Sequence, residues 1–285
     1  MSPVSTRLRR TSLSHVALSS PDVDAMAQFY ETVMGMVRHP SEGAVLLGWG
    51  NGHHVLELSD GPVGLDHFAF EIGDAGGPDS LAERLRQSEV EVEALPEAAG
   101  YRVRDPEGNA VHFHGRISRS GEGCGGAGFR PVRVQHVTLG TREMKPMVDF
   151  YSSIGFSVTD RMEDSFTWLR SNVEHHSLAI VGVGRSVLDH YSYDLESWAD
   201  FKTWADRLTD LGIPVTWGPG RHGPGNNLFL FFDDPDGHHI ELSAEMEKFF
   251  DDRVRYETRI WERSSRTVNL WGGQVPRWRN TGEEG

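Results

Sequence analysis

Cysteine is nearly absent from the sequence, since Cys124 is the only one among 285 residues. A single cysteine excludes an internal disulfide and a metal cluster held by several thiolates. Long apolar runs are also missing, because none approaches the roughly 20 residues that a membrane-spanning helix needs. The N-terminal segment MSPVSTRLRRTSLSH has no apolar stretch after its arginines, which is unlike a signal peptide. We therefore expect a cytoplasmic protein that does not contact a membrane.

Positive charge is scarce as well. The chain has 28 lysines and arginines against 42 aspartates and glutamates, which gives a formal net charge of -14. Nucleic acids and anionic membranes require a basic surface, so the charge argues against both as partners. Hydrophobic residues make up 38% of the chain and charged residues 25%, as in a globular protein. A small-molecule substrate remains compatible with all these numbers.

The sequence contains an internal repeat, in which four segments recur in the same order. The four matched pairs are HVALSSPDVDAMAQFYETVMGM with HVTLGTREMKPMVDFYSSIGF, NGHHVLEL with VEHHSLAI, LDHFAFEI with LDHYSYDL, and RDPEGNAVHF with DDPDGHHIEL. Self-similarity of this kind indicates duplicated structural units. We therefore predict homologous domains at 10–117 and 130–246, a glycine-rich linker between them, and a separate tail at 247–285.

Each half has the same predicted order of secondary structure. An alternating strand pattern comes first, an amphipathic helix follows, and several short strands come next. The order then recurs within the half, with a second helix at SLAERLRQ or WADFKTWADRLTDLG and a final turn at DPEG or DPDG. The pattern predicts an α+β fold with curled mixed sheets.

Glu241 occupies an unusual position, between Ile240 and Leu242 in a predicted strand. A carboxylate inside a sheet is costly unless it is paired or coordinates a cation. His136 and His190 lie in similar strand contexts, although a histidine in a strand is more often structural. Two imidazoles and one carboxylate together form the ligand set that suits non-haem Fe(II) and leaves coordination positions open.

The most specific motif is RHGPGNNLFLFFDDPDGHHIE at 221–241, which runs through a GPG loop, an apolar strand and a DPDG turn. With this motif and the repeat, the sequence resembles the type I extradiol ring-cleaving dioxygenases of the vicinal oxygen chelate superfamily, in their homoprotocatechuate and dihydroxybiphenyl branches. The resemblance implies two tandem vicinal oxygen chelate domains. Each would contain two βαβββ modules that form a curled mixed sheet, and a C-terminal tail would follow.

The resemblance also implies roles for individual residues. His136, His190 and Glu241 match the metal ligands, with Fe(II) as the expected ion and Mn(II) as the alternative. His176 matches the catalytic histidine beside the metal, and His222 matches the histidine near the substrate oxygen. The implied reaction is extradiol cleavage of a small aromatic diol by dioxygen, and the implied assembly is a homo-oligomer.

The expected substrate pocket departs from the family at two positions. Phe231 stands where the family has a tyrosine, and Trp217 stands where one branch has a carboxylate-binding arginine. Trp168 matches a family tryptophan, although core packing is an equal alternative for it. With Phe231 in place of the tyrosine, its hydrogen bond is either missing or supplied by another residue, for which Tyr191 and Tyr193 are the candidates. We predict that the substrate contacts Trp168, Phe231, Trp217 and Tyr191 in a largely apolar pocket.

These departures keep two other functions open. One is a non-redox, metal-dependent isomerase or hydrolase of the same superfamily, which would turn over its substrate without dioxygen. The other is a protein that sequesters an aromatic ligand in a metal-free cup, which would bind tightly without catalysis. The sequence favours the dioxygenase because the ligand set, the second histidine and the motif occur together.

The N-terminal half has histidines at the corresponding positions. His15, His67 and His112 stand where the other half has its three ligands, and His54 corresponds to His176. Three histidines can form a divalent metal site. The alternative is a remnant of duplication whose histidines hydrogen-bond within a closed cup. The sequence favours the remnant, because analogy between folds is weak evidence for a site.

The tail segment RIWERSSRTVNLWGGQVPRWRN contains three tryptophans and several arginines. It could pack as a helix and strand on the surface or on a neighbouring subunit. We favour a lid over the C-terminal pocket, because a segment that closes an active site excludes water from the reaction.

Overall fold

The computed structural model describes most of the chain, namely residues 7–39, 41–49, 53–87, 90–95, 100–117, 129–250, 256–273 and 275–276. Most of the predicted glycine-rich linker, with Cys124, lies outside these ranges. Among the helices described, none has the length and apolar character needed to cross a membrane.

The N-terminal half consists of two modules with the order β-α-β-β-β. The first module comprises β1 (Thr11–Ser20), α1 (Val23–Met34), β2 (Val37–His39), β3 (Val45–Gly48) and β4 (Leu56–Asp60). The second comprises β5 (Gly64–Ile72), α2 (Gly77–Gln87), β6 (Glu93–Leu95), β7 (Gly100–Arg104) and β8 (Ala110–His114).

The C-terminal half repeats this order, and the tail then adds two short elements. Its first module comprises β9 (Arg133–Thr141), α3 (Met144–Ser153), β10 (Ser157–Met162), β11 (Phe166–Arg170) and β12 (Leu178–Gly182). Its second comprises β13 (Val187–Asp194), α4 (Trp198–Asp210), β14 (Trp217–Arg221), β15 (Leu228–Asp233) and β16 (His239–Ala244). The tail elements are β17 (Arg259–Trp261) and α5 (Ser265–Val268).

Each half forms one mixed sheet. The strand order is β2-β3-β4-β1-β5-β8-β7-β6 in the first sheet and β14-β15-β16-β13-β9-β12-β11-β10-β17 in the second. In both, the leading strands of the two modules pair antiparallel at the centre, as β1 with β5 and β9 with β13. The last strand of each module runs parallel to its leading strand. The predicted α+β fold of tandem modules is thus confirmed.

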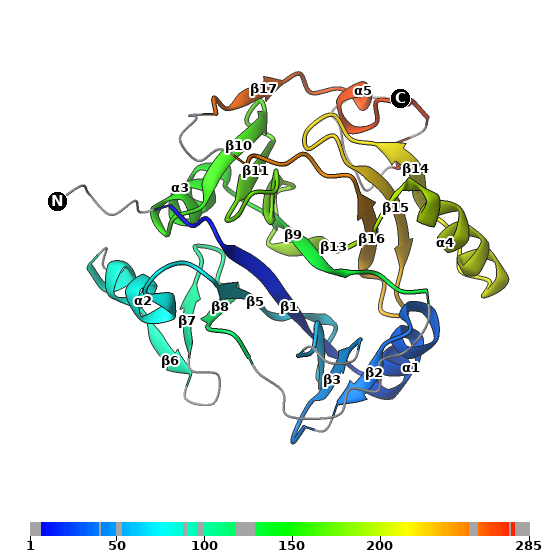
Figure 1. Ribbon diagram of the computed structural model, residues 1–285, viewed down its shortest axis with the longest axis horizontal. Coiled ribbons are helices and arrows are strands. Elements are labelled where there is room, and N and C mark those ends of the chain that lie inside the picture. The colour runs from blue at the N-terminus through cyan, green and yellow to red at the C-terminus, as the bar shows by residue number, and fades with distance from the viewer. Residues whose placement is uncertain are drawn as a thin grey trace.

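The helices lie outside the curled sheets (Figure 1). Helices α3 and α4 flank the C-terminal sheet on opposite sides, and the tail elements β17 and α5 cross its upper end in this view. Strand β17 extends the sheet by pairing parallel with β10. The tail is therefore part of the C-terminal domain's structure. Strand β17 lies beside β10 at one edge of the sheet, and Leu270 N–H donates to the carbonyl of Arg221 on β14 at the opposite edge.

The predicted turns are built by aspartate side chains. Asp105 Oδ1 accepts hydrogen bonds from the backbone N–H groups of Glu107 and Asn109, both at 2.9 Å. Asp234 Oδ1 does the same for Asp236 at 3.0 Å and His238 at 2.9 Å. An aspartate that satisfies the backbone in this way fixes the tight connection into the following strand.

The same two aspartates join the halves. Tyr30 on α1 donates its hydroxyl proton to Asp234 Oδ2 at 2.8 Å, and Tyr151 on α3 donates to Asp105 Oδ2 at 2.9 Å. Tyr191 donates in turn to the Tyr30 hydroxyl. Burial, and then the neighbouring aspartate charge, raise the pKa of both Tyr30 and Tyr151, so these phenols stay neutral donors. The repeated Phe-Tyr and DPxG motifs therefore hold the two domains together.

Candidate metal centre and active site

Strand register brings the three predicted metal ligands together. Ser192 on β13 pairs with His136 on β9 on one side and with Glu241 on β16 on the other. His190 precedes Ser192 by two residues, so its side chain points to the same face of β13. Three neighbouring strands thus place two imidazoles and one carboxylate on one patch of the sheet.

The donor atoms of this triad lie at nearly equal distances. His136 Nε2 is 3.3 Å from His190 Nε2, and Glu241 Oε2 is 3.1 Å from His136 Nε2 and 3.2 Å from His190 Nε2. Ligand atoms about 2.1 Å from a metal and at right angles to each other lie about 3.0 Å apart. The triad therefore has the dimensions of one face of a coordination octahedron, which is the arrangement of the two-histidine, one-carboxylate sites.

The opposite ring nitrogens fix the tautomer of both histidines. His136 Nδ1 lies 3.0 Å from Gln135 Oε1, and His190 Nδ1 lies 2.6 Å from Asp189 Oδ2. Because each oxygen accepts the Nδ1–H, each Nε2 presents a lone pair toward the other donors. Two lone pairs and a carboxylate converge where a cation would relieve their repulsion, so the residues fit a divalent metal.

Glu241 is ionised in this environment. Burial alone would raise its pKa, but the nearby His136 and His190 reverse this and hold the pKa far below the usual range. The other carboxylate oxygen, Oε1, accepts a hydrogen bond from Asn227 Nδ2 at 3.1 Å, and Asn227 also donates to Ser243 at 2.9 Å. Asn227 thus orients the carboxylate, a role that its position in a loop did not reveal.

Three side chains in contact, His176, His175 and Asp160, lead from the pocket into the core. His176 Nδ1 lies 3.0 Å from His175 Nδ1, and His175 Nε2 lies 3.0 Å from Asp160 Oδ2. If His175 donates its Nε2–H to Asp160, then His175 Nδ1 has a lone pair and can accept the Nδ1–H of His176. In that case His176 Nε2 carries a lone pair. Burial, followed by the neighbouring His136 and His175, lowers the pKa of His176 well below its usual value. His176 is therefore a neutral base at the pocket.

Two residues of the tail hold Asp160, the last of these three side chains. Arg259 Nε donates to Asp160 Oδ1 at 2.8 Å and Trp261 Nε1 donates to Asp160 Oδ2 at 2.7 Å. These hydrogen bonds, with the one from His175, outweigh the effect of burial and lower the pKa of Asp160. The sequence offered no signal for this arrangement, since the tail and β10 are about a hundred residues apart.

His222 approaches the triad from the loop before β15. Its Nε2 is 3.7 Å from Glu241 Oε1, and its Nδ1 donates to the Val268 carbonyl at 2.6 Å. The ring stacks on Phe229, with 4.0 Å between centroids. The α5 segment of the tail therefore sets the orientation of His222 and forms part of the wall around the metal ligands.

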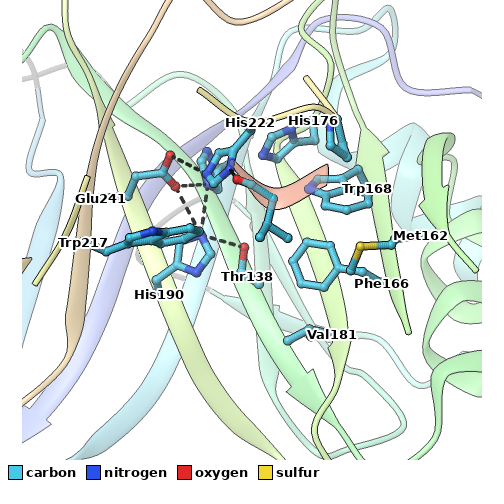
Figure 2. Close-up of a pocket in the computed structure, with 13 residues that line it drawn as sticks. Thr138, Met162, Phe166, Trp168, His176, Val181, His190, Trp217, His222 and Glu241 are labelled. Carbon is cyan, nitrogen blue, oxygen red and sulfur yellow. Dashed lines mark hydrogen bonds and ion pairs between the residues drawn. The ribbon is translucent and has the colours of Figure 1, made fainter. Parts of the chain in front are cut away.

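The triad lies at one end of a cavity lined mostly by apolar side chains (Figure 2). Figure 2 shows Glu241, His190 and Trp217 on one side of this cavity and Trp168 and Phe166 on the other. The apolar lining side chains come from β10, β11, β12, β14, the loop before β15, and α5, and they are Met162, Phe166, Trp168, Val181, Trp217, Pro224 and Val268. No lysine or arginine belongs to this described lining.

Only two of the four predicted substrate residues line the cavity. Trp168 and Trp217 line the cavity. Phe231 lies behind them, with its ring 5.2 Å from the rings of both His190 and Trp217. Tyr191 was placed wrongly by the sequence, because neighbouring residues of β13 point to opposite faces. While His190 faces the cavity, Tyr191 is fully buried on the core side against Tyr30.

Tyr193 lies on the same core-facing side of β13 as Tyr191 and is fully buried near Trp49, with 5.5 Å between ring centroids. Neither tyrosine can therefore replace the missing family hydroxyl. The polar group that sequence reasoning missed in the cavity is Thr138, whose Oγ1 lies 3.1 Å from His190 Nε2. Its position two residues after His136, on the same face of β9, is the signal that could have found it.

Paired βαβββ modules and a buried His-His-Glu triad define a two-domain protein of the vicinal oxygen chelate class. The family model described as Glyoxalase/Bleomycin resistance protein/Dioxygenase superfamily matches residues 12–113 and 133–242. The chain belongs to this superfamily.

Two relatives illustrate the similarity in sequence. The manganese-dependent 2,3-dihydroxybiphenyl 1,2-dioxygenase of Geobacillus genomosp. 3 is 24% identical over 275 residues, which cover 83% of this chain and 86% of the relative. Metapyrocatechase 2 of Cupriavidus necator is 32% identical over 120 residues, which cover 41% of this chain and 38% of that protein.

Solved structures show the same fold. The Mn(II)-bound glyoxalase from Novosphingobium aromaticivorans has a TM-score of 0.79 at 26% identity, covering 93% of this chain and 91% of its own. The homoprotocatechuate 2,3-dioxygenase from Brevibacterium fuscum, in its anaerobic complex with 3,4-dihydroxyphenylacetate, has a TM-score of 0.82 at 22% identity, covering 98% and 94%.

Proposed function

We propose that the chain is an extradiol dioxygenase that cleaves an apolar catechol with dioxygen, using Fe(II), or alternatively Mn(II), on His136, His190 and Glu241. The observation that carries this proposal is the convergence of three metal donors at one end of an apolar cavity that also contains a neutral histidine. The similarity to a dihydroxybiphenyl dioxygenase and to a metapyrocatechase supports the same reaction.

A metal held by His136, His190 and Glu241 would act as a Lewis acid that orients the reactants and stabilises the negative charge that develops on them. The chain's own residues would then move protons and exclude water. With its Nδ1–H donated to His175, 3.0 Å away, His176 would accept a proton in the cavity at Nε2. His222, held through Nδ1 by the Val268 carbonyl, positions its Nε2 beside the substrate oxygen.

The lining of the cavity selects the substrate. Trp217 and Trp168 offer aromatic surface, and the absence of a cationic side chain from the described lining removes a partner for a substrate carboxylate. A carboxylate buried there without a partner would be costly. We therefore infer that the preferred catechol carries an uncharged, apolar substituent.

The tail would act as a lid over this cavity. Val268 lines the cavity, and Trp261 packs against the same apolar cluster. We further propose that the enzyme is cytoplasmic and homo-oligomeric. In support, Trp198 and Trp271 contact each other edge to face on the surface, with exposures of 46% and 51%. Exposed aromatic surface of this kind is common at protein interfaces.

An oxygen-electrode screen tests the proposed reaction. Protein loaded with Fe(II) or Mn(II) is mixed with a panel of catechols, and we expect oxygen uptake that is largest for those with apolar substituents. The Mn(II)-bound glyoxalase relative and the missing hydroxyl at Phe231 favour a non-redox metal enzyme as the second candidate. Turnover under strict exclusion of oxygen would support that candidate, whereas tight ligand binding without turnover or bound metal would indicate a sequestering protein.

Replacing Phe231 with tyrosine tests the apolar pocket. The new hydroxyl would enter an aromatic cluster formed with Trp217 and Phe229, and a buried phenol without a partner costs about 1–3 kcal/mol. We expect Phe231→Tyr to retain metal. We also expect its kcat/KM for 3,4-dihydroxyphenylacetate to rise relative to its kcat/KM for 2,3-dihydroxybiphenyl. Steady-state kinetics of both variants with both catechols measure the shift. A large gain on the apolar catechol would show instead that the pocket merely lacked a hydroxyl.

Replacing Asp160 with asparagine tests the chain behind His176. Without the carboxylate, His175 loses its anionic acceptor and holds His176 less firmly, so we expect kcat to fall about tenfold while the KM for catechol stays nearly constant. Asp164→Asn, an exposed change nearby, is the matched control. Equal kcat in both variants would remove Asp160 from the mechanism.

The pH dependence of stability gives a second readout for Asp160. Its folded-state pKa is lowered, so its ionised form stabilises the fold at pH values above the unfolded pKa of about 3.9, and this contribution disappears as the pH falls through the folded pKa. Wild type should therefore be more stable than Asp160→Asn near neutral pH, and the two should converge in acid. Urea unfolding between neutral pH and about pH 3 measures the difference.

A further inference from the structure

The N-terminal half reproduces the donor geometry of the C-terminal metal centre. His15 Nε2 lies 3.1 Å from His67 Nε2, compared with 3.3 Å between His136 and His190. The ring planes of the two pairs meet at 86° and 87°. The strand register is also the same, because Ala69 on β5 pairs with both His15 and His112, as Ser192 pairs with both flanking ligands in the other half.

The neighbouring groups that fix the tautomers are repeated as well. His67 Nδ1 lies 2.7 Å from Asp66 Oδ2, the counterpart of the bond that Asp189 makes. His15 Nδ1 lies 3.2 Å from Ser14 Oγ, at the position that Gln135 occupies in the other half. His54 flanks His15 with 4.2 Å between rings and 53° between planes, compared with 4.4 Å and 57° for the corresponding pair at the metal centre.

The hydrogen bonds around the two histidines leave His15 Nε2 and His67 Nε2 each with a lone pair and no proton. His114 donates its Nδ1–H to the Gly115 carbonyl at 2.6 Å, which leaves its Nε2 as an acceptor for the Ser14 hydroxyl proton at 2.9 Å. His53 Nε2, 3.1 Å from Ser14 Oγ, would then be a donor to that oxygen. Ser14 Oγ can then accept the His15 Nδ1–H, and Asp66 accepts the His67 Nδ1–H. His15 Nε2 and His67 Nε2 therefore cannot hydrogen-bond to each other as neutral rings. A cation between them would satisfy both.

The third donor differs from the one that the repeat indicates. His112 takes the chain position of Glu241, but its ring stacks on His67 with centroids 3.8 Å apart. The carboxylate of Glu57 instead lies with the donor atoms of His15 and His67, all within 4.8 Å of one another. Glu57 comes from β4, on the other side of β1, where it pairs with Ala17. The carboxylate has thus changed strands, and the set of two imidazoles and one carboxylate is retained.

We propose that the N-terminal half binds a second divalent transition-metal ion through His15, His67 and Glu57. Imidazole donors favour Zn(II) or Fe(II) over Mg(II) and Ca(II), which prefer oxygen ligands. His15 and His67 are buried, with exposures of 5% and 6%, whereas the Glu57 side chain is 26% exposed and provides the route from solvent. The duplication therefore left two metal sites with different third ligands rather than one site and a remnant.

Metal stoichiometry tests the proposal on the full chain. Apo protein is loaded with Zn(II), freed of excess ion, and analysed for zinc per chain by mass spectrometry. We expect two zinc ions in wild type and one in His190→Gln/Glu241→Gln, which lacks two C-terminal ligands. Adding His67→Gln to that variant should remove the remaining ion. One ion in wild type, or an ion that persists in the triple variant, would overturn the proposal.

Two further variants separate the third ligand from a loss of folding. In the His190→Gln/Glu241→Gln background, Glu57→Gln should weaken zinc binding by more than about tenfold, whereas His112→Gln should change it by less than about threefold. Glu57 is partly exposed, so its replacement is compatible with a folded chain, which circular dichroism checks. Equal zinc affinity for the Glu57 variant and its parent would contradict the assignment.

Discussion

Glu241→Gln is expected to abolish most metal binding at the C-terminal centre and to reduce kcat/KM by more than about 100-fold. The carboxylate is the only anionic member of the triad, and its Oε2 lies 3.1 Å and 3.2 Å from the two histidine nitrogens. Changes behind a metal ligand already cost about 10–100-fold, so loss of the ligand itself should cost more. Metal analysis and steady-state kinetics on the same preparation measure both effects.

The matched control is Glu196→Gln, which removes an exposed glutamate from the loop before α4. It should retain the metal content and turnover of wild type. Because the N-terminal half has its own proposed site, metal content must be compared with a variant of that half, such as Glu57→Gln. Full activity in Glu241→Gln would show that the buried carboxylate serves the fold rather than a metal.

His176→Phe is expected to retain metal while kcat falls by about 10²–10⁴, the range usual for a general acid or base. The neutral His176 ring lies 4.4 Å from the ring of His136, next to the proposed metal ligands without belonging to the donor triad. The substitution removes proton exchange and leaves the donors in place. Metal content, catechol binding measured without oxygen, and single-turnover rates separate these contributions.

His239→Phe provides the control for introducing a phenyl ring. His239 lies on β16 with its Nδ1 2.7 Å from Asp233, outside the cavity lining. Its replacement should leave turnover within about twofold of wild type. If His176→Phe lost metal as completely as Glu241→Gln, His176 would be a ligand, and the geometry of the triad would have to be reinterpreted.

The repeat predicted much of the architecture because duplicated modules leave local signals. The alternating strands, the Phe-Tyr helices and the DPxG turns are each encoded within about ten residues, so their order could be read directly. The ligand candidates His136, His190 and Glu241 came from their strand contexts and from the family resemblance that the 221–241 motif carries, and the repeat also marks the positions of the two histidines. The limit of the sequence predictions was that they did not apply the alternation of side chains along a strand to every residue of the pocket.

Tyr191 illustrates that limit. It follows His190 and was expected in the pocket, but the alternation of β13 sends it to the core, where Tyr30 from the other domain accepts its proton. The partnership of Asp160 with Arg259 and Trp261 was hidden for another reason, because it joins segments separated by about a hundred residues. Contacts of this range carry no local periodicity.

Glu57 marks where the proposed N-terminal site departs from the alignment. The repeat assigns His112 to the third ligand position, and only the pairing of β4 with β1 reveals a carboxylate on the other side of His15. A register match between halves identifies equivalent positions, but a donor can be supplied from either neighbouring strand. The proposed N-terminal site therefore rests on the spatial clustering of donor atoms rather than on the alignment.

Cleavage of an apolar catechol under ¹⁸O₂ tests the central claim most directly. Metal-loaded protein is incubated with 2,3-dihydroxybiphenyl, and the product is analysed by mass spectrometry after rapid quenching to limit exchange with water. The proposed dioxygenase should place both labelled oxygen atoms in a ring-opened product, with one dioxygen consumed per catechol. Turnover that proceeds without oxygen, or a product that contains no label, would contradict the account.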